Sequence, residues 1–174
     1  MIDFDDIKYL KFGNSKQRAS YNILKKHNIF EILKDFSPIL VGTIPLNIDI
    51  DIDTSDLDII CSWNIKDNFI ELIKNNFYNK EKFKISEKII RNELSIISSF
   101  YIEKFKIEVF GQKTPVKEQF AYKHMVIEYN ILKYRGENFK LKVIELKKLG
   151  YKTEEAFTKL LNVSGDPYIE LLKL

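Results

Sequence analysis

The chain has 174 residues, of which 45% are apolar and 13% aromatic, so it can bury one sizeable core in a single domain. Charged residues make up 30%, but the net charge is only +3, which indicates neither a disordered chain nor an obligate nucleic-acid binder. The acidic N-terminus and the lack of an apolar stretch of about 20 residues argue against secretion and membrane insertion. The single cysteine, Cys61, fits a reducing, cytoplasmic setting.

The first elements predicted along the chain are a helix and a short buried strand. Asn14 or Ser15 can cap the helix, because a short polar side chain accepts a hydrogen bond from an unpaired backbone amide at a helix start. Apolar residues then keep helical spacing, with a break at residues 27–28, until Pro38 ends the pattern. The apolar run at residues 39–41 predicts a buried strand.

An acidic segment follows this strand. Residues 48–53 alternate Ile and Asp, which places Asp49, Asp51 and Asp53 on one face if the segment is extended. We interpret these three aspartates as a polar strand face or a solvated loop rather than as the principal acid pair. The apolar run at residues 57–60 predicts a second strand.

The middle of the chain predicts a helix and then a meander of strands. Asp67 is suited to cap a helix whose apolar positions continue to Phe77. Beyond that helix the sequence is rich in β-branched and aromatic residues. The strands predicted there lie at residues 83–90, 95–102 and 105–110, with turns at Asn92-Glu93 and Glu103-Lys104.

Helices are predicted for the last third of the chain. Residues 117–134 contain no Gly or Pro and keep apolar residues at helical spacing. Thr153 can cap a later helix, and Asp166-Pro167 is typical of a cap followed by a first helical residue.

These elements predict an α+β fold. We expect a mixed or antiparallel sheet of about five strands, with an N-terminal helix and a C-terminal helical region. Residues 1–174 would form one domain, with an α/β core at 1–115 and a helical part at 116–174.

Two aspartates begin the second predicted strand. Asp56 and Asp58 are separated by one residue and point to the same face, where both can hold one hard cation. Mg²⁺ binds through a few carboxylates plus substrate phosphates, so the pair suits a metal–triphosphate. Glu108 is the candidate third carboxylate, and Lys106 shares its strand face. The alternative is that this face is an ordinary solvated side of an antiparallel sheet.

Three motifs together resemble the nucleotidyltransferase superfamily with the polymerase-β type of catalytic domain. They are Val41-Gly42-Thr43, Ser55-Asp56-Leu57-Asp58-Ile59 and Ile107-Glu108-Val109. The sequence departs from the family pattern in having Thr43 where Ser is commoner, and in the Ile–Asp alternation before the acid pair.

A closer resemblance covers nearly the whole chain. It is similar to a bacterial family within this superfamily that is described only as a domain of unknown function. The residues that carry this resemblance are the run from Leu40 through Cys61, together with Phe110-Gly111-Gln112 and Gly165-Asp166-Pro167-Tyr168.

The superfamily resemblance implies a two-metal phosphoryl transfer that uses Mg²⁺ or Mn²⁺. By the same resemblance, Asp56 and Asp58 would be shared metal ligands, and Glu108 would complete the set and help to deprotonate an acceptor hydroxyl. The residues expected to bind the nucleoside triphosphate are Gly42, Thr43 and Ser55.

Three further residues are weaker site candidates. His124 reads either as a hydrogen-bonded histidine at the edge of the core or, with Lys123 and Tyr122, as part of a substrate cleft. Arg91 can fork onto a phosphate, although an exposed ion pair is the commoner role of an arginine at such a place.

The expected function is transfer of a nucleoside monophosphate from a nucleoside triphosphate to a hydroxyl on a small molecule, a protein or RNA. The alternative is a catalytically inert binding module of the same fold, for example an antitoxin-like component, because a fold does not guarantee an activity. Nucleic-acid binding alone has only the mild basicity of the chain in its favour.

Overall fold

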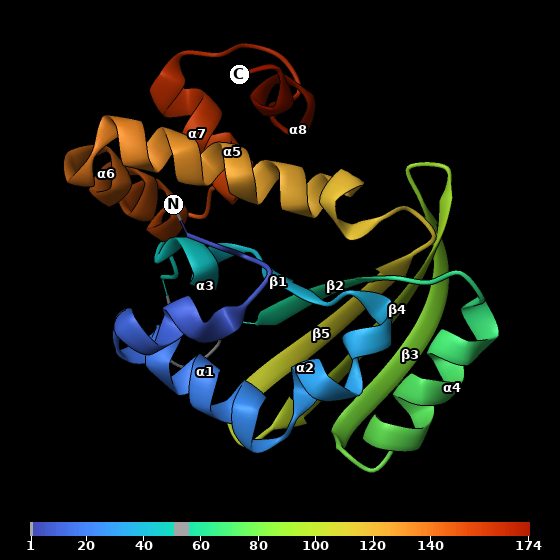
Figure 1. The fold of residues 1–174 in the computed structure, drawn as a ribbon. Coiled ribbons are helices and arrows are strands. Elements are labelled where there is room, and N and C mark those ends of the chain that lie inside the picture. The colour runs from blue at the N-terminus through green and yellow to red at the C-terminus, as the bar shows by residue number, and fades with distance from the viewer. Residues whose placement is uncertain (1, 51–55) are drawn as a thin grey trace.

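The computed structural model describes residues 2–50 and 56–174. A five-stranded sheet forms its centre, with α1 and α2 on one side and the C-terminal helices on the other (Figure 1). The predicted positions Asp51, Asp53 and Ser55 lie outside the described residues. No helix within residues 2–50 and 56–174 has the length and apolar character needed to cross a bilayer.

The sheet is mixed, as expected for the predicted α+β fold. Its order is β1-β2-β5-β4-β3, in which β2 and β5 are parallel and the other neighbours are antiparallel. The strands are β1 (Ile39–Val41), β2 (Leu57–Ser62), β3 (Glu81–Ile90), β4 (Glu93–Ile102) and β5 (Phe105–Gln112).

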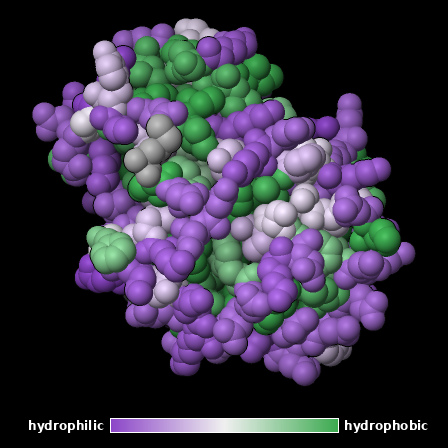
Figure 2. Space-filling view, viewed as in Figure 1, coloured by the Kyte–Doolittle hydropathy of each residue, from purple (hydrophilic) through white to green (hydrophobic). Residues whose placement is uncertain are grey.

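Helices flank the sheet in two groups. The N-terminal group is η1 (Ile7–Phe12), α1 (Ser15–Lys26), α2 (Ile29–Ile32), η2 (Lys34–Phe36), α3 (Thr43–Leu46) and α4 (Lys66–Phe77). The C-terminal group is η3 (Val116–Glu118), α5 (Phe120–Arg135), α6 (Glu137–Lys148), α7 (Thr153–Leu161), α8 (Pro167–Glu170) and η4 (Leu171–Lys173). In Figure 2, which has the same view, apolar side chains gather at the top, over the C-terminal helices.

The first predicted helix cap is confirmed. The Asn14 side chain accepts a hydrogen bond from the backbone amide of Gln17, and the Gln17 side chain accepts one from the backbone amide of Asn14. This reciprocal pair satisfies two amides that a helix start otherwise leaves unpaired.

Other predicted boundaries are wrong by a few residues. Asp67 lies in the first turn of α4 instead of capping it, and Thr153 is the first residue of α7. The helix predicted from residue 117 begins at Phe120, because residues 116–118 form a separate 3₁₀ turn. An acidic residue in a first turn favours the helix through its positive end, so Asp67 keeps a stabilising place.

The two hairpin turns differ in how well they were predicted. The β4–β5 turn is at Glu103-Lys104, as expected. The β3–β4 turn lies one residue earlier than predicted, at Arg91-Asn92, and Glu93 begins β4. Arg91 and Asn92 have φ values of 52° and 62°, the positive backbone angles that a two-residue hairpin turn of this hand requires and that Asn tolerates.

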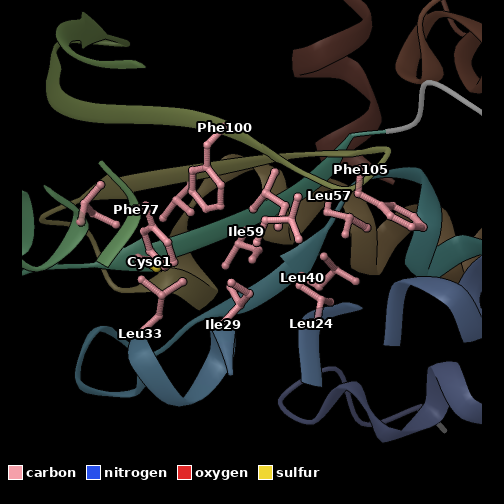
Figure 3. Packing of buried hydrophobic residues seen from close by; sticks show 14 of the residues in the cluster. Leu24, Ile29, Leu33, Leu40, Leu57, Ile59, Cys61, Phe77, Phe100 and Phe105 are labelled. Atoms are coloured by element: carbon pink, nitrogen blue, oxygen red, sulfur yellow. The ribbon is translucent and has the colours of Figure 1, made fainter. Parts of the chain in front are cut away.

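One face of the sheet packs against α1, α2 and α4 (Figure 3). The odd-numbered residues of β2 and β5 point to this face because side chains alternate along a strand. The ring of Phe77 in α4 stacks on Phe100 in β4 with centroids 4.5 Å apart, and the Cys61 thiol is buried here. Alternation therefore sends Asp58 and Glu108 to the opposite face.

The opposite face is only partly covered. Its apolar residues Ile39, Val41 and Ile60 belong to a second core, which they share with side chains of α5, α6 and α7. Next to Ile60 and farther along β5 the same face carries polar residues. The candidate acids thus lie where the covered part of this face ends.

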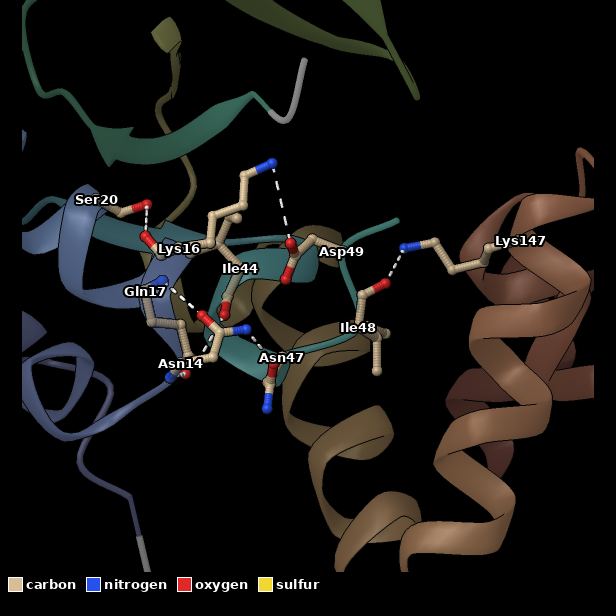
Figure 4. A network of polar contacts seen from close by, with 9 residues as sticks. All are labelled: Asn14, Lys16, Gln17, Ser20, Ile44, Asn47, Ile48, Asp49 and Lys147. Carbon is tan, nitrogen blue, oxygen red and sulfur yellow. Dashed lines mark hydrogen bonds and ion pairs between the residues drawn. The ribbon is translucent and has the colours of Figure 1, made fainter. Parts of the chain in front are cut away.

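Polar contacts anchor the segment that leads toward the acids (Figure 4). The side-chain amide of Asn14 donates to the side-chain oxygen of Asn47. From the other side, Lys147 Nζ in α6 donates to the carbonyl of Ile48 over 2.7 Å. Helices from both halves of the chain therefore hold residues 47–48.

The expectation that Asp49 is solvated is wrong. Its side chain is only 9% exposed, and its carboxylate lies 3.9 Å from Lys16 Nζ (Figure 4). Ile48 is fully buried whereas Ile50 is 44% exposed, so the alternation does not place them on one face. The reason is that residues 47–50 follow α3 outside any strand, and period-2 alternation orients side chains only in extended backbone.

Candidate functional site

A cavity of about 550 Å³ opens where the partly covered sheet face meets α5 and α7. Its sheet wall includes Gly42, Asp58 and Glu108, and its helix wall includes His124 and Glu128. Residues from the two halves of the chain thus line one cavity.

Strand pairing brings the predicted sheet-wall residues together. Asp58 in β2 lies opposite Val41 in β1 and opposite Glu108 in β5. The adjacent Gly42 has a φ of +81°, and a Cβ built there would lie 2.8 Å from Asp58 Oδ2. Glycine is required at this position because of both the backbone angle and the closeness of the carboxylate. Thr43, the first residue of α3, also lines the cavity.

On the sheet wall, three carboxyl groups lie near one ammonium group. Burial, followed by the neighbouring carboxylates of Glu108 and Asp56, raises the pKa of Asp58 to about 7, and Lys106 partly opposes this. Lys106 Nζ lies 2.6 Å from Asp56 Oδ2 and 3.8 Å from Glu108 Oε2. A hydrogen bond to Asp56 raises the pKa of Lys106, which holds its positive charge between two of the acids.

The donor chemistry of this wall fits a hard divalent cation. Asp56, Asp58 and Glu108 supply carboxylate oxygens, the ligands that Mg²⁺ prefers, and their mutual repulsion favours a cation among them. In residues 2–50 and 56–174, however, no three acidic, His or Cys side chains converge as a ligand group. A metal ion would have to compete with Lys106 for Asp56.

On the helix wall His124 is held at both ring nitrogens. Nδ1 lies 3.1 Å from Glu154 Oε1 in α7, and Nε2 lies 2.9 Å from the carbonyl oxygen of Tyr168. His124 is buried at the edge of the core and also lines the cavity, so the two interpretations of this residue do not exclude each other. Its hydrogen bond to Glu154 helps to lower the pKa of that carboxyl against the opposing effect of burial.

Sequence reasoning missed Glu128, the residue one helical turn after His124. Its side chain is 4% exposed, and its Oε1 has no hydrogen-bond partner among the described residues. Burial, with a further contribution from Glu154, raises the pKa of Glu128 well above its ordinary value, and Lys147 opposes the shift. The spacing of four residues from His124 was the available signal, because such residues share a helix face.

The remaining weak candidates lie at or outside the edge of the cavity. Arg91 lines it, and its guanidinium lies 4.1 Å from the ring centroid of Phe120, in a cation–π contact. Lys123 is exposed on α5.

Several solved structures share this fold. A structure of Cid1, described for its RNA terminal uridylyl transferase activity, has a TM-score of 0.53 at 13% identity and covers 82% of this chain and 47% of its own. The GLD-2/RNP-8 complex has a TM-score of 0.51 at 13% identity, with coverages of 83% and 56%. The polymerase core of TRAMP, an RNA surveillance complex, has a TM-score of 0.52 at 11% identity, with coverages of 95% and 51%.

These similarities place the chain in the nucleotidyltransferase fold class, and at such identities they show the fold alone. The chain spans 40% to 47% of the length of the similar Cid1 structures. No curated protein matches the sequence. A family model described as "Domain of unknown function (DUF4269)" matches residues 22–174, and the chain belongs to this family.

Proposed function

We propose that this chain is a Mg²⁺-dependent nucleotidyltransferase that transfers a nucleoside monophosphate from a nucleoside triphosphate to a hydroxyl acceptor. The observation that carries the proposal is the cross-strand row in which Asp58 lies opposite Glu108 and next to Gly42, at the wall of a cavity. Two acids and a close backbone approach are the parts that binding a metal–triphosphate needs.

The roles follow from position. Asp56, Asp58 and Glu108 would hold Mg²⁺ or Mn²⁺, and the metal when bound neutralises charge on the reacting phosphate oxygens. Glu108 is 37% exposed and can accept the proton of an acceptor hydroxyl that enters the cavity. Gly42 has no side chain and lets the backbone lie close to Asp58, and the Thr43 hydroxyl and amide can donate to a phosphate held there. Ser55 is proposed as a nucleotide contact from the family resemblance.

One observation favours the alternative of an inert binding module. Lys106 pairs with Asp56 and lies near Glu108, so these acids have a counter-charge from the chain itself. A module that had lost its chemistry would keep the fold and such a pair. The acceptor, whether a small molecule, a protein or RNA, is part of the proposal only as a hydroxyl compound.

Labelling with nucleotide tests the proposal. The full chain is incubated with each of the four nucleoside triphosphates, labelled at the α-phosphate, with Mg²⁺ and a cell extract as the source of acceptor. We expect labelled product with the wild type and none with the Asp56→Asn/Asp58→Asn variant. Equal labelling by both proteins, or labelling by neither with every triphosphate, contradicts the catalytic function and leaves the inert module.

A further inference from the structure

Glu128 lies in the helix wall of the cavity, away from the strands that carry the acids. It is 4% exposed, it lines the cavity, and its Oε1 has no hydrogen-bond partner among the described residues. A buried carboxyl oxygen without a partner is unfavourable, because its hydration has been lost and nothing replaces it. The arrangement is explained if a ligand supplies the missing donor.

The nearest cationic side chains are already engaged. Lys147 in α6 donates to the carbonyl of Ile48 over 2.7 Å. His124, one turn earlier in α5, pairs with Glu154 of α7 over 3.1 Å. Glu154 itself adds negative charge near Glu128. The partner that Glu128 Oε1 lacks is therefore a hydrogen-bond donor from outside these helices, and the negative charge of Glu154 favours a cationic donor.

The lining of the whole cavity also favours a cationic ligand. Among the described residues, acidic side chains line both its sheet wall and its helix wall, whereas the basic side chains that line it are Arg91 and His124. Arg91 lies over the ring of Phe120 and His124 is bonded to Glu154, so both already have partners within the protein. Without a bound metal, such a lining favours a cation over a neutral polyol.

We propose that Glu128 recognises an ammonium group of the acceptor, so that the acceptor is an amine-bearing hydroxyl compound. Its hydroxyl would face Asp58 and Glu108 at the sheet wall while its amine binds Glu128 at the helix wall of the same cavity. The role as an acceptor site rests on the proposed nucleotidyl transfer. The binding of an amine does not, so binding and transfer are measured separately.

The protonation of Glu128 gives this proposal a distinctive signature. Burial and the charge of Glu154 raise its pKa, and Lys147 opposes this, so the empty site takes up a proton more readily than an exposed carboxylate does. An entering ammonium ion favours the ionised carboxylate, and the proton leaves to the solvent. Binding of an amine beside Glu128 therefore releases protons, and this release depends on the Glu128 carboxyl.

Calorimetric titration of the full chain tests the site. The probes are glucamine, a linear amino polyol that is cationic at neutral pH, and sorbitol, in which a hydroxyl replaces the amine. We expect glucamine to bind at least about tenfold more tightly than sorbitol, the effect of one hydrogen bond to a charged group. Titration in buffers of different ionisation enthalpy should show proton release with glucamine.

Matched variants assign the effect to one side chain. Glu128→Gln keeps the shape and removes the charge, and it should lose both the glucamine preference and the proton release. Glu118→Gln changes an exposed carboxylate at the edge of the same cavity and should keep both. Glu128→Met gives the same test if the Gln variant does not fold, as judged from its melting curve.

The outcomes separate the two proposals. Equal binding of glucamine and sorbitol, no binding of glucamine, or an unchanged preference in Glu128→Gln overturns the amine site. A Glu128→Gln effect on one nucleoside triphosphate but not on glucamine also overturns it, since Glu128 would then contact the nucleobase. Glucamine selectivity without any nucleotide transfer supports the amine site and overturns the proposed enzyme.

Discussion

The two walls of the cavity handle negative charge in opposite ways. On the sheet wall, Asp56 and Glu108 are about one-third exposed and lie near Lys106, so water and an internal cation offset their charge. On the helix wall, Glu128 is almost fully buried and has an oxygen without a partner. The sheet wall is stable without a ligand, and a metal ion can replace Lys106 there. On the helix wall, Glu128 lacks a hydrogen-bond donor unless a ligand supplies it.

The difference has a structural origin. Neighbouring strands fix the spacing of the acids through the register that places Asp58 opposite Glu108. The helix wall instead depends on how α5, α6 and α7 pack, because Glu128, Lys147 and Glu154 each come from a different helix. Changes at the sheet wall should therefore affect chemistry most, and changes at the helix wall should affect selectivity and stability.

Asp58→Asn should have the largest effect, and this effect should fall on nucleotide transfer at the sheet wall. We expect transfer to fall by at least about a hundredfold, the scale for removing one group that stabilises transition-state charge. Glucamine should keep its preference over sorbitol, since its amine binds Glu128 at the other wall. The melting temperature should not fall, because the substitution relieves repulsion with Asp56 and Glu108. If this variant transfers nucleotide at the wild-type rate, measured with labelled triphosphates, the cross-strand row is not the reaction centre.

Gly42→Ala should show how closely the backbone must approach Asp58. Gly136 makes a matched control, because its φ of +75° is similar to the +81° of Gly42 but nothing lies within 4 Å of a Cβ built there. Each alanine carries a backbone cost of about 1–3 kcal/mol, and only Gly42→Ala adds the contact with the carboxylate. Thermal melts should place Gly42→Ala below Gly136→Ala; equal melting temperatures are incompatible with a tight contact at Asp58.

Glu128→Gln should change how stability depends on pH. Burial holds the folded-state pKa of Glu128 well above its ordinary value, so folding takes up a proton and wild-type stability falls as the pH rises above the ordinary carboxyl range. Glutamine does not titrate and escapes this loss. We expect the variant to melt at a higher temperature than the wild type near pH 7, and the difference to shrink as the pH falls toward 4. A constant difference between pH 4 and pH 7 would contradict the raised pKa.

Lys106→Gln should have the smallest effect, on metal affinity. Removing the ammonium group frees Asp56, and a partly exposed ion pair contributes about 0.2–1 kcal/mol, so Mg²⁺ should bind at most about fivefold more tightly. The measurement is the rise in melting temperature with Mg²⁺ relative to chelator, because a ligand that binds the folded state stabilises it. Lys104→Gln in the exposed β4–β5 turn serves as the control. The absence of any Mg²⁺ shift at saturation in all three proteins counts against a metal at these carboxylates.

Much of the local structure was predictable from the sequence. The strands followed from alternating or continuous apolar runs, and the Asn14 cap followed from a short polar side chain ahead of a helical pattern. The errors arose where several local arrangements satisfy the same pattern. The hairpin turn at Arg91-Asn92 differs by one residue from the predicted turn, and both positions contain Asn92. Asp49 was wrongly predicted to be solvated, because the spacing of residues along the chain does not reveal its buried ion pair with Lys16.

For the candidate site, local sequence patterns were enough to show which side chains share one face of a strand or helix. Lys106 and Glu108 lie on one face of β5 because side chains alternate along a strand, and Glu128 shares a helix face with His124. The parallel pairing of β2 with β5, which places Glu108 opposite Asp58, could be known only from the three-dimensional structure. The same is true of the burial of Glu128. Strand order and helix packing join residues far apart in the chain, and local periodicity carries no information about such pairings.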